Sequence, residues 1–133
     1  MLAYEIPFAF SPVSAGFPSP ADDYLEGRLN IHTHFVKKPA STIFMEAPDD
    51  SMVEFGIFQG DMLIVDQSLK PQNNKMVVVD FEGERVVRRF IEKKGRRFLA
   101  VGKKNPRYTS IDTEYGVNII GVATYVIRDL LNR

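Results

Sequence analysis

The chain has 133 residues, of which 44% are hydrophobic and 26% are charged, values typical of one compact globular domain. Seventeen basic side chains balance seventeen acidic ones, so the net charge gives no indication of binding to nucleic acid or to a membrane. The absence of cysteine excludes disulfides, cysteine nucleophiles and thiolate metal sites.

The N-terminal segment is rich in proline and in apolar side chains. Residues 1–7 lack the basic start and the continuous apolar run of a signal peptide, and no window is apolar for long enough to span a membrane. We therefore expect a cytoplasmic protein without membrane contact. Four prolines within residues 1–20 exclude a long helix and predict an extended, mobile arm. Its frequent aromatic residues indicate that the arm docks on a folded surface for part of the time.

A short helix is predicted directly after the arm. Ser19 is placed to cap it, Pro20 takes the first helical position, and Asp22 and Asp23 lie in the first turn, where the helix dipole favours carboxylates. We expect this helix to end at about Leu29.

His32 and His34 form an isolated His-x-His pattern. In an extended segment, alternation would place both imidazoles on one face, as some metal sites require. No cluster offers a third ligand, so we interpret the two histidines as loop residues and expect no metal site and no cofactor.

From residue 41 the pattern changes to β-strands, because runs of Val, Ile and Phe are bounded by Gly, Asn and Pro. Phe81 to Glu84 and Lys93 to Arg96 are predicted as hairpin turns, with Gly83 supplying an unusual backbone conformation. Residues 129–131 are expected to form a helical turn. These signals predict a mostly antiparallel β domain that closes on itself or folds into a sandwich. The expected strands are 42–46, 61–66, 75–81, 84–91, 97–101 and 117–127.

Ten basic residues gather in one third of the chain. We interpret them as the solvated face of a hairpin and not as a nucleic-acid surface, because stacking aromatics are not regularly interleaved there. The residues are Arg85, Arg88, Arg89, Lys93, Lys94, Arg96, Arg97, Lys103, Lys104 and Arg107.

Four stretches together resemble the family of self-cleaving serine peptidases that includes UmuD and LexA. They are Ala15 to Pro20, Asp49 to Met52, Gly60 to Asp66 and Val86 to Phe90. The resemblance implies a LexA/UmuD-like peptidase domain of short antiparallel strands over residues 21–133, preceded by an N-terminal arm over residues 1–20. It also implies self-cleavage at the small-residue-then-glycine junction within the first stretch, the Ala15–Gly16 bond.

The resemblance also implies the chemistry. Ser51 matches the nucleophile of the family, and backbone amides at Ser51, with Met52 as a second donor, would hold the oxyanion. A neutral lysine on a neighbouring strand is the general base of the family, and it works because burial lowers its pKa.

The base does not match, because Arg88 stands at the lysine position and a shift of one residue offers only Arg89. A guanidinium stays protonated in proteins and cannot accept the serine proton. The nearest lysines, Lys93 and Lys94, fall in a predicted turn. We therefore expect weak self-cleavage or none. Asp49, where the family usually has glycine, is a second departure that we expect to tighten the turn.

The resemblance further implies partners and a role. These are a homodimer, stimulation of cleavage by the RecA filament, association with a UmuC-type polymerase, and a place as accessory subunit in SOS-induced error-prone translesion DNA synthesis. One alternative is the C-terminal domain of a LexA-like repressor, but fifteen residues before the junction are too few for a helix-turn-helix domain, so no sequence-specific DNA binding is expected. A catalytically dead binding module is another alternative. A membrane signal peptidase would need an anchoring helix.

Overall fold

The structure is a computed structural model that describes residues 5–7, 28–113 and 116–132. The chain divides into two compact units, Met1–Pro39 and Ala40–Arg133. Within the smaller unit, strand β1 (Glu5–Pro7) pairs antiparallel with β2 (Arg28–Asn30), and helix α2 (Ile31–Phe35) follows directly. The boundary expected at residue 20 lies outside the described residues.

The predicted end of the N-terminal helix is wrong. Most of that helix lies outside the described residues, but Arg28–Asn30 is a strand, and α2 begins only after it. Asn30 caps α2, because its side-chain oxygen Oδ1 accepts a hydrogen bond of 3.1 Å from the amide of Thr33. Pairing with β1 is a contact that the local pattern of residues 20–29 could not indicate.

The interpretation of His32 and His34 as loop residues is also wrong, since both lie within α2. Residues two apart on an α-helix are rotated by about 200°, so the two side chains leave the helix in nearly opposite directions. The ring of His34 contacts Phe35 edge-on, at 4.8 Å between centroids. Over the described residues, no group of three or more His, Cys, Asp or Glu is placed to hold a metal ion.

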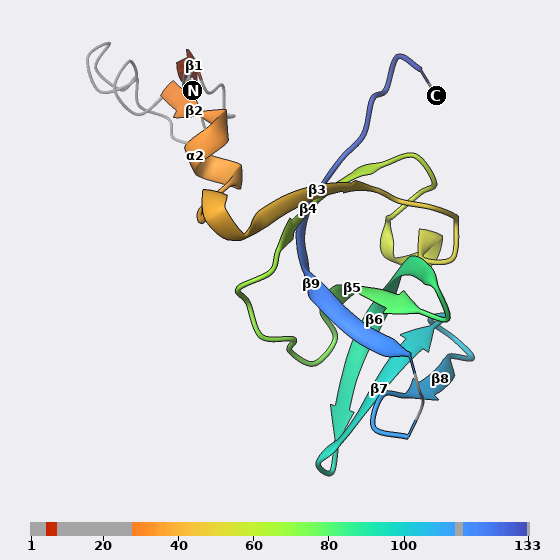
Figure 1. Cartoon of the computed structure of the whole chain (residues 1–133). Coiled ribbons are helices and arrows are strands. Elements are labelled where there is room, and N and C mark those ends of the chain that lie inside the picture. Colours follow the sequence, from red (N-terminus) through yellow and green to blue (C-terminus); the bar gives the residue numbers. More distant parts are fainter. Residues whose placement is uncertain (1–4, 8–27, 114–115, 133) are drawn as a thin grey trace, which may run out of the picture. The chain divides into compact units, whose positions relative to one another are not determined.

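The larger unit carries one antiparallel sheet of seven strands in the order β3-β4-β9-β5-β6-β7-β8 (Figure 1). A sandwich or a closed barrel was expected, but β3 and β8 remain at the two ends of this sheet. The strands are β3 (Thr42–Glu46), β4 (Met62–Asp66), β5 (Met76–Phe81), β6 (Glu84–Lys93), β7 (Arg96–Val101), β8 (Arg107–Ser110) and β9 (Val117–Ile127). All six strands expected in this unit are present within two residues at each end.

Strand β8 was not predicted. Its four residues, Arg107–Ser110, lack a run of β-branched apolar residues and lie in the part of the chain that we interpreted as a solvated basic face. Pairing with β7, in which Arg107 lies opposite Val101, makes this segment a strand. An edge strand gains its hydrogen bonds from its neighbour, and that gain does not show in local sequence.

Both predicted hairpin turns are confirmed. Glu82 and Gly83 have φ angles of 52° and 81°, and Lys94 and Gly95 have 53° and 74°. Two successive residues with positive φ define the turn whose twist matches that of the flanking strands.

The helical segments of the larger unit are short. The 3-10 helix η1 (Pro39–Ser41) crosses the boundary between the units, and η2 (Val53–Phe55) follows Ser51. The helical turn expected at 129–131 is a non-helical turn, in which the carboxylate of Asp129 accepts the amide of Leu131 at 3.0 Å. In the part of the chain that the structure describes, no helix is long and apolar enough to cross a membrane.

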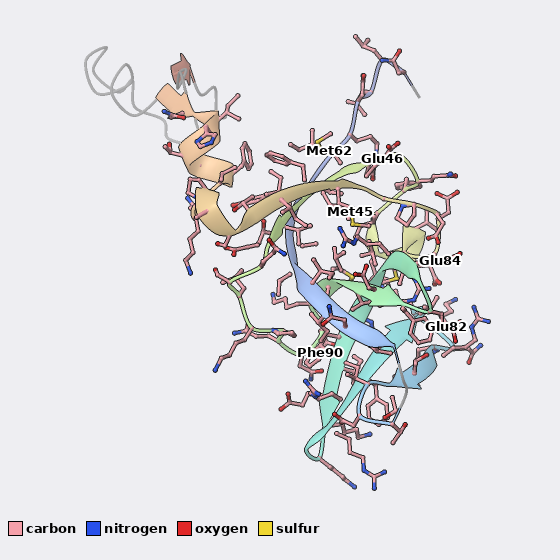
Figure 2. All side chains as sticks on the ribbon, in the orientation of Figure 1. Met45, Glu46, Met62, Glu82, Glu84 and Phe90 are labelled. Carbon is pink, nitrogen blue, oxygen red and sulfur yellow. The ribbon has the colours of Figure 1, made fainter. Side chains whose placement is uncertain are left out.

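Apolar side chains pack on both faces of the sheet, in two clusters. Alternation along β5 divides them, because Val78 lies in the first cluster while Val77 and Val79 lie in the second. Phe90, labelled in Figure 2, is the largest side chain of the second cluster. The first cluster also contains residues from the segment between β3 and β4, namely Ala47, Met52 and Ile57. That segment therefore covers one face of the sheet.

We expect Gly121→Ala to destabilise the sheet by about 1–3 kcal/mol, as overpacking commonly does. A Cβ at this position of β9 would lie 2.9 Å from the backbone oxygen of Asp66 and 2.9 Å from Cγ1 of Val65. Denaturant unfolding measures the change, with Asn118→Ala, an exposed position of the same strand, as the control. Equal stabilities of the two variants would contradict the close approach.

Candidate active site at Ser51

Ser51 lies in a turn between β3 and η2, and the next residue anchors that turn in the core. The side chain of Met52 is 1% exposed and belongs to the first cluster. Its carbonyl accepts hydrogen bonds from the amides of Phe55, at 2.9 Å, and Ile57, at 3.3 Å. The serine is thus presented on a segment fixed by burial and by backbone hydrogen bonds.

Asp50 ties the two ends of this segment together. Its carboxylate accepts the amide of Gln59 at 2.9 Å, and its carbonyl accepts the amide of Val53 at 3.2 Å. A side chain that accepts a hydrogen bond from a backbone amide nine residues away holds the two ends of the loop together and thereby fixes Ser51.

An ion pair with one buried partner lies at the end of the same segment. The carboxylate of Asp61, whose side chain is fully buried, accepts two hydrogen bonds from Arg128, of 2.7 and 2.8 Å. Asp61 also accepts the amide of Phe58 at 2.8 Å, and Arg128 donates to the carbonyl of Gly56 at 2.9 Å. Hydrogen bonding to Asp61 raises the pKa of Arg128. Sequence reasoning missed this contact, because its partners stand 67 residues apart.

We expect Arg128→Met to destabilise the fold strongly, because it leaves the Asp61 carboxylate buried without its cation. Thermal unfolding followed by circular dichroism measures the loss. The matched control is Arg97→Met, which breaks a similar pair of 2.9 Å with Asp112 whose partners are 46% and 41% exposed, and exposed pairs contribute little. Equal losses in both variants would show that the burial of Asp61 does not matter.

The structure brings Arg88 to Ser51. Nη1 of Arg88 donates to Oγ of Ser51 at 3.1 Å and to the carbonyl of Val87 at 2.8 Å. The ladder between β6 and β7 ends at the pair of Arg89 and Ala100, so Arg88 lies where β6 leaves this partner. The catalytic roles of Ser51 and Arg88 remain predictions.

Arg89, the other candidate in the shifted register, points elsewhere. Its guanidinium lies over the ring of Phe55, at 5.1 Å from the centroid, and its Nη1 donates to the side chain of Asn74 at 3.0 Å. Lys93 is the last residue of β6, and Lys94 lies in the turn that follows, so neither lysine occupies the position on the strand that contacts Ser51. The side chain that meets Ser51 is therefore the one at position 88.

Asp49 completes the polar group around the serine. Its Oδ1 accepts the backbone amide of Ser51 at 3.0 Å. Hydrogen bonding to the Ser51 side chain, then to its amide, together with the charge of Arg88, lowers the pKa of Asp49. Because Arg88 donates to the serine Oγ, the hydroxyl proton is directed away from Arg88. The sequence had suggested only that this residue tightens the turn.

Arg88 is partly buried beside these groups. Burial lowers its pKa, Asp49 opposes that change, and Arg107 of β8 adds to it. A guanidinium nonetheless remains protonated at neutral pH. Arg88 therefore donates to Ser51 and does not accept its proton.

The two backbone amides expected to hold the oxyanion differ in whether they already donate a hydrogen bond. The amide of Ser51 is already engaged by Asp49, whereas no described residue accepts a hydrogen bond from the amide of Met52. The Ala15–Gly16 junction lies outside the described residues, so its position relative to Ser51 remains a prediction.

Comparison with known proteins agrees with this architecture. A family model described as Peptidase S24-like matches residues 7–124. ImpA of Salmonella typhimurium is 35% identical over 125 residues, which cover 94% of this chain and 85% of ImpA. SamA of S. typhimurium LT2 is 38% identical over 113 residues, covering 85% and 78%. The LexA repressor of Clostridium perfringens is 31% identical over 102 residues, covering 77% of this chain and 49% of the repressor.

A mostly antiparallel β domain, the fold class expected from the sequence, carries the serine-bearing segment on one face of its sheet. The chain belongs to the peptidase S24-like family and is UmuD-like. The resemblance drawn from the four sequence stretches is thereby confirmed.

Proposed function

We propose that the chain is a UmuD-like accessory subunit in SOS-induced error-prone translesion DNA synthesis, and that its self-cleavage is attenuated. The observation that carries this proposal is the 3.1 Å hydrogen bond from Arg88 to Ser51 Oγ within a peptidase S24-like domain. In this proposal Ser51 is the nucleophile and Arg88 occupies the place of the general base.

Self-cleavage would proceed by attack of Ser51 Oγ on the carbonyl carbon of Ala15. The serine proton must pass to a base, and the bond to the Gly16 nitrogen then breaks as that nitrogen takes the proton. Water would hydrolyse the resulting ester and free residues 1–15. Arg88 cannot accept the proton, and Asp49, which accepts the Ser51 amide, has a lowered pKa that makes it a weak base. We therefore propose that self-cleavage is slow or does not occur.

An exposed apolar surface supports a homodimer. Side chains at one end of β3, β4 and β9 share a face, since Phe44 aligns through Ile64 with Tyr125, and Glu46 aligns through Met62 with Ile127. Figure 2 shows Glu46 and Met62 side by side there. Exposed apolar patches of this kind mark protein contacts. The exposed members are Phe44 at 59%, Met62 at 46%, Tyr125 at 37% and Ile127 at 48%.

The resemblance to the UmuD and LexA family supports the further partners that we propose. In the proposal, the RecA filament stimulates cleavage, a UmuC-type polymerase binds the subunit, and the protein acts in the cytoplasm without binding specific DNA sequences.

Sedimentation of the purified chain, unchanged and carrying Met62→Glu, tests the proposed dimer. A concentration-dependent dimer that the substitution dissociates supports this surface, and a monomer at all concentrations contradicts it.

The experiment on activity is incubation of the full chain with activated RecA filament, and separately at alkaline pH, followed by mass spectrometry. A fragment beginning at Gly16 that disappears in Ser51→Ala shows cleavage despite Arg88. A fragment that persists in Ser51→Ala would show a contaminating protease and remove the role of this serine.

A second candidate is a catalytically dead binding module, which the Arg88 contact favours. The two differ in the result of Ser51→Ala on polymerase-dependent mutagenesis in cells: an unchanged mutation frequency supports the binding module, and a reduced one supports cleavage. The LexA-like alternative rests on a lower identity, 31% over 102 residues, and the chain spans about half the length of that LexA repressor.

A further inference from the structure

Two groups of opposite charge engage Ser51 at once. The carboxylate of Asp49 accepts the serine amide at 3.0 Å, and Nη1 of Arg88 donates to Oγ at 3.1 Å. The amide and the hydroxyl are the two groups of a nucleophilic serine that peptide hydrolysis uses. Both are therefore occupied in this arrangement.

We infer that Asp49 is a positioning residue that holds Ser51 in a resting arrangement, by occupying its amide and by favouring a positive charge on the side chain at position 88. This inference rests on the proposed function and adds a means of regulation at the same site. It predicts that Arg88 and Asp49 both lower the rate of self-cleavage.

The first effect acts on the oxyanion. Attack on a carbonyl places negative charge on its oxygen, and backbone amides stabilise that charge only if their hydrogens are directed at it. The Ser51 amide is directed at the Asp49 carboxylate instead, and that carboxylate would repel the oxyanion. Loss of one such donor typically costs about 10²–10³-fold in rate.

The second effect acts on the base. Among the described residues, the charges of Asp49 and Arg107 act on Arg88, while Val77, its partner on β5, is apolar. A carboxylate near a cation favours the protonated form. If position 88 carried a lysine, Asp49 would raise its pKa and reduce the fraction of neutral amine at neutral pH. Cleavage would then require more alkaline conditions.

The test compares three full-length chains: Arg88→Lys alone, with Asp49→Asn, and with Asp49→Gly. Asparagine keeps an oxygen that accepts the Ser51 amide but removes the charge, whereas glycine removes both. Release of the fragment beginning at Gly16 is followed by mass spectrometry across a range of pH, with Ser51→Ala added to each chain as a blank.

We expect Asp49→Asn to move the midpoint of the pH–rate profile of Arg88→Lys downward by about one pH unit or more, with little change in the maximal rate. Asp49→Gly should produce the same shift and raise the maximal rate by about 10²-fold or more. A change that merely loosened the turn would alter the rate without moving the midpoint. Coincident midpoints and plateaus in all three chains would overturn the inference.

A second measurement does not depend on cleavage. In the Ser51→Ala background, NMR titration of the lysine introduced by Arg88→Lys gives its pKa with and without Asp49→Asn. A lower pKa in the Asn variant supports the inference even if no chain cuts. In that case the proposed peptidase activity is rejected, but the electrostatic effect of Asp49 is not. An unchanged pKa refutes the electrostatic effect even if all chains cut.

Discussion

Arg88→Lys is expected to release a fragment beginning at Gly16 about 10²–10⁴-fold faster than the unchanged chain, the usual contribution of a positioned base. The guanidinium lies 3.1 Å from Ser51 Oγ, so an amine on the same strand residue would come within reach of the serine proton. Partial burial of position 88 lowers the pKa of a lysine there, which favours the neutral form. Mass spectrometry of a time course at alkaline pH measures the gain.

The matched control is Arg89→Lys, which makes the same chemical change one residue along. Its side chain lies over Phe55 and donates to Asn74, so an amine there would not meet Ser51, and the rate should not change. Acceleration in both variants would show that any added lysine suffices. No acceleration in Arg88→Lys at any pH, with Ser51 intact, would remove position 88 from the site of the base.

Phe90→Ala is expected to lower the free energy of unfolding by about 3–5 kcal/mol, the usual cost of truncating a buried aromatic residue. Phe90 is 1% exposed and lies in the second apolar cluster. Its backbone also bonds to the segment before β5, accepting the amide of Asn74 at 2.7 Å and donating to Lys75 at 2.8 Å. The loss is a large share of the stability of a typical domain, and urea unfolding measures it.

Phe44→Ala is the control for this prediction, because Phe44 is 59% exposed on β3. Surface substitutions usually change stability by less than about 0.5 kcal/mol. A loss in Phe44→Ala as large as that in Phe90→Ala would mean that β3 is covered in solution, for example by a second copy of the chain. Sedimentation at the same protein concentrations distinguishes that case from an error in the assignment of the core.

Most strands and both hairpin turns could be predicted from the sequence. β5 is a run of valines, and Gly83 and Gly95 occupy turn positions whose φ angles favour glycine. These features are local, since strand propensity and turn geometry depend on a few neighbouring residues. The prediction failed where the partner decided the structure: β8 is a strand because of β7, and residues 28–30 pair with β1.

The candidate site was predicted in part. Spacing and resemblance selected Ser51 and placed Arg88 opposite it, with Arg89 as the alternative in a register shifted by one residue. In the structure Arg88, one residue beyond the last β6–β7 pair, contacts the serine, whereas Arg89 lies over Phe55. The hydrogen bond of Asp49 to the Ser51 amide depends on the turn that follows β3, which no local pattern specifies.

The sequence by itself determined most of the strand pattern, the family and the choice of Ser51 as the candidate nucleophile, because each depends on residue types and spacings along the chain. Only the tertiary structure decided which charges surround that serine, and that Asp61 and Arg128 fix the segment that carries it. The reason is physical: hydrogen bonds and ion pairs act over a few ångströms in space. Their partners here stand 37 and 67 positions apart in sequence.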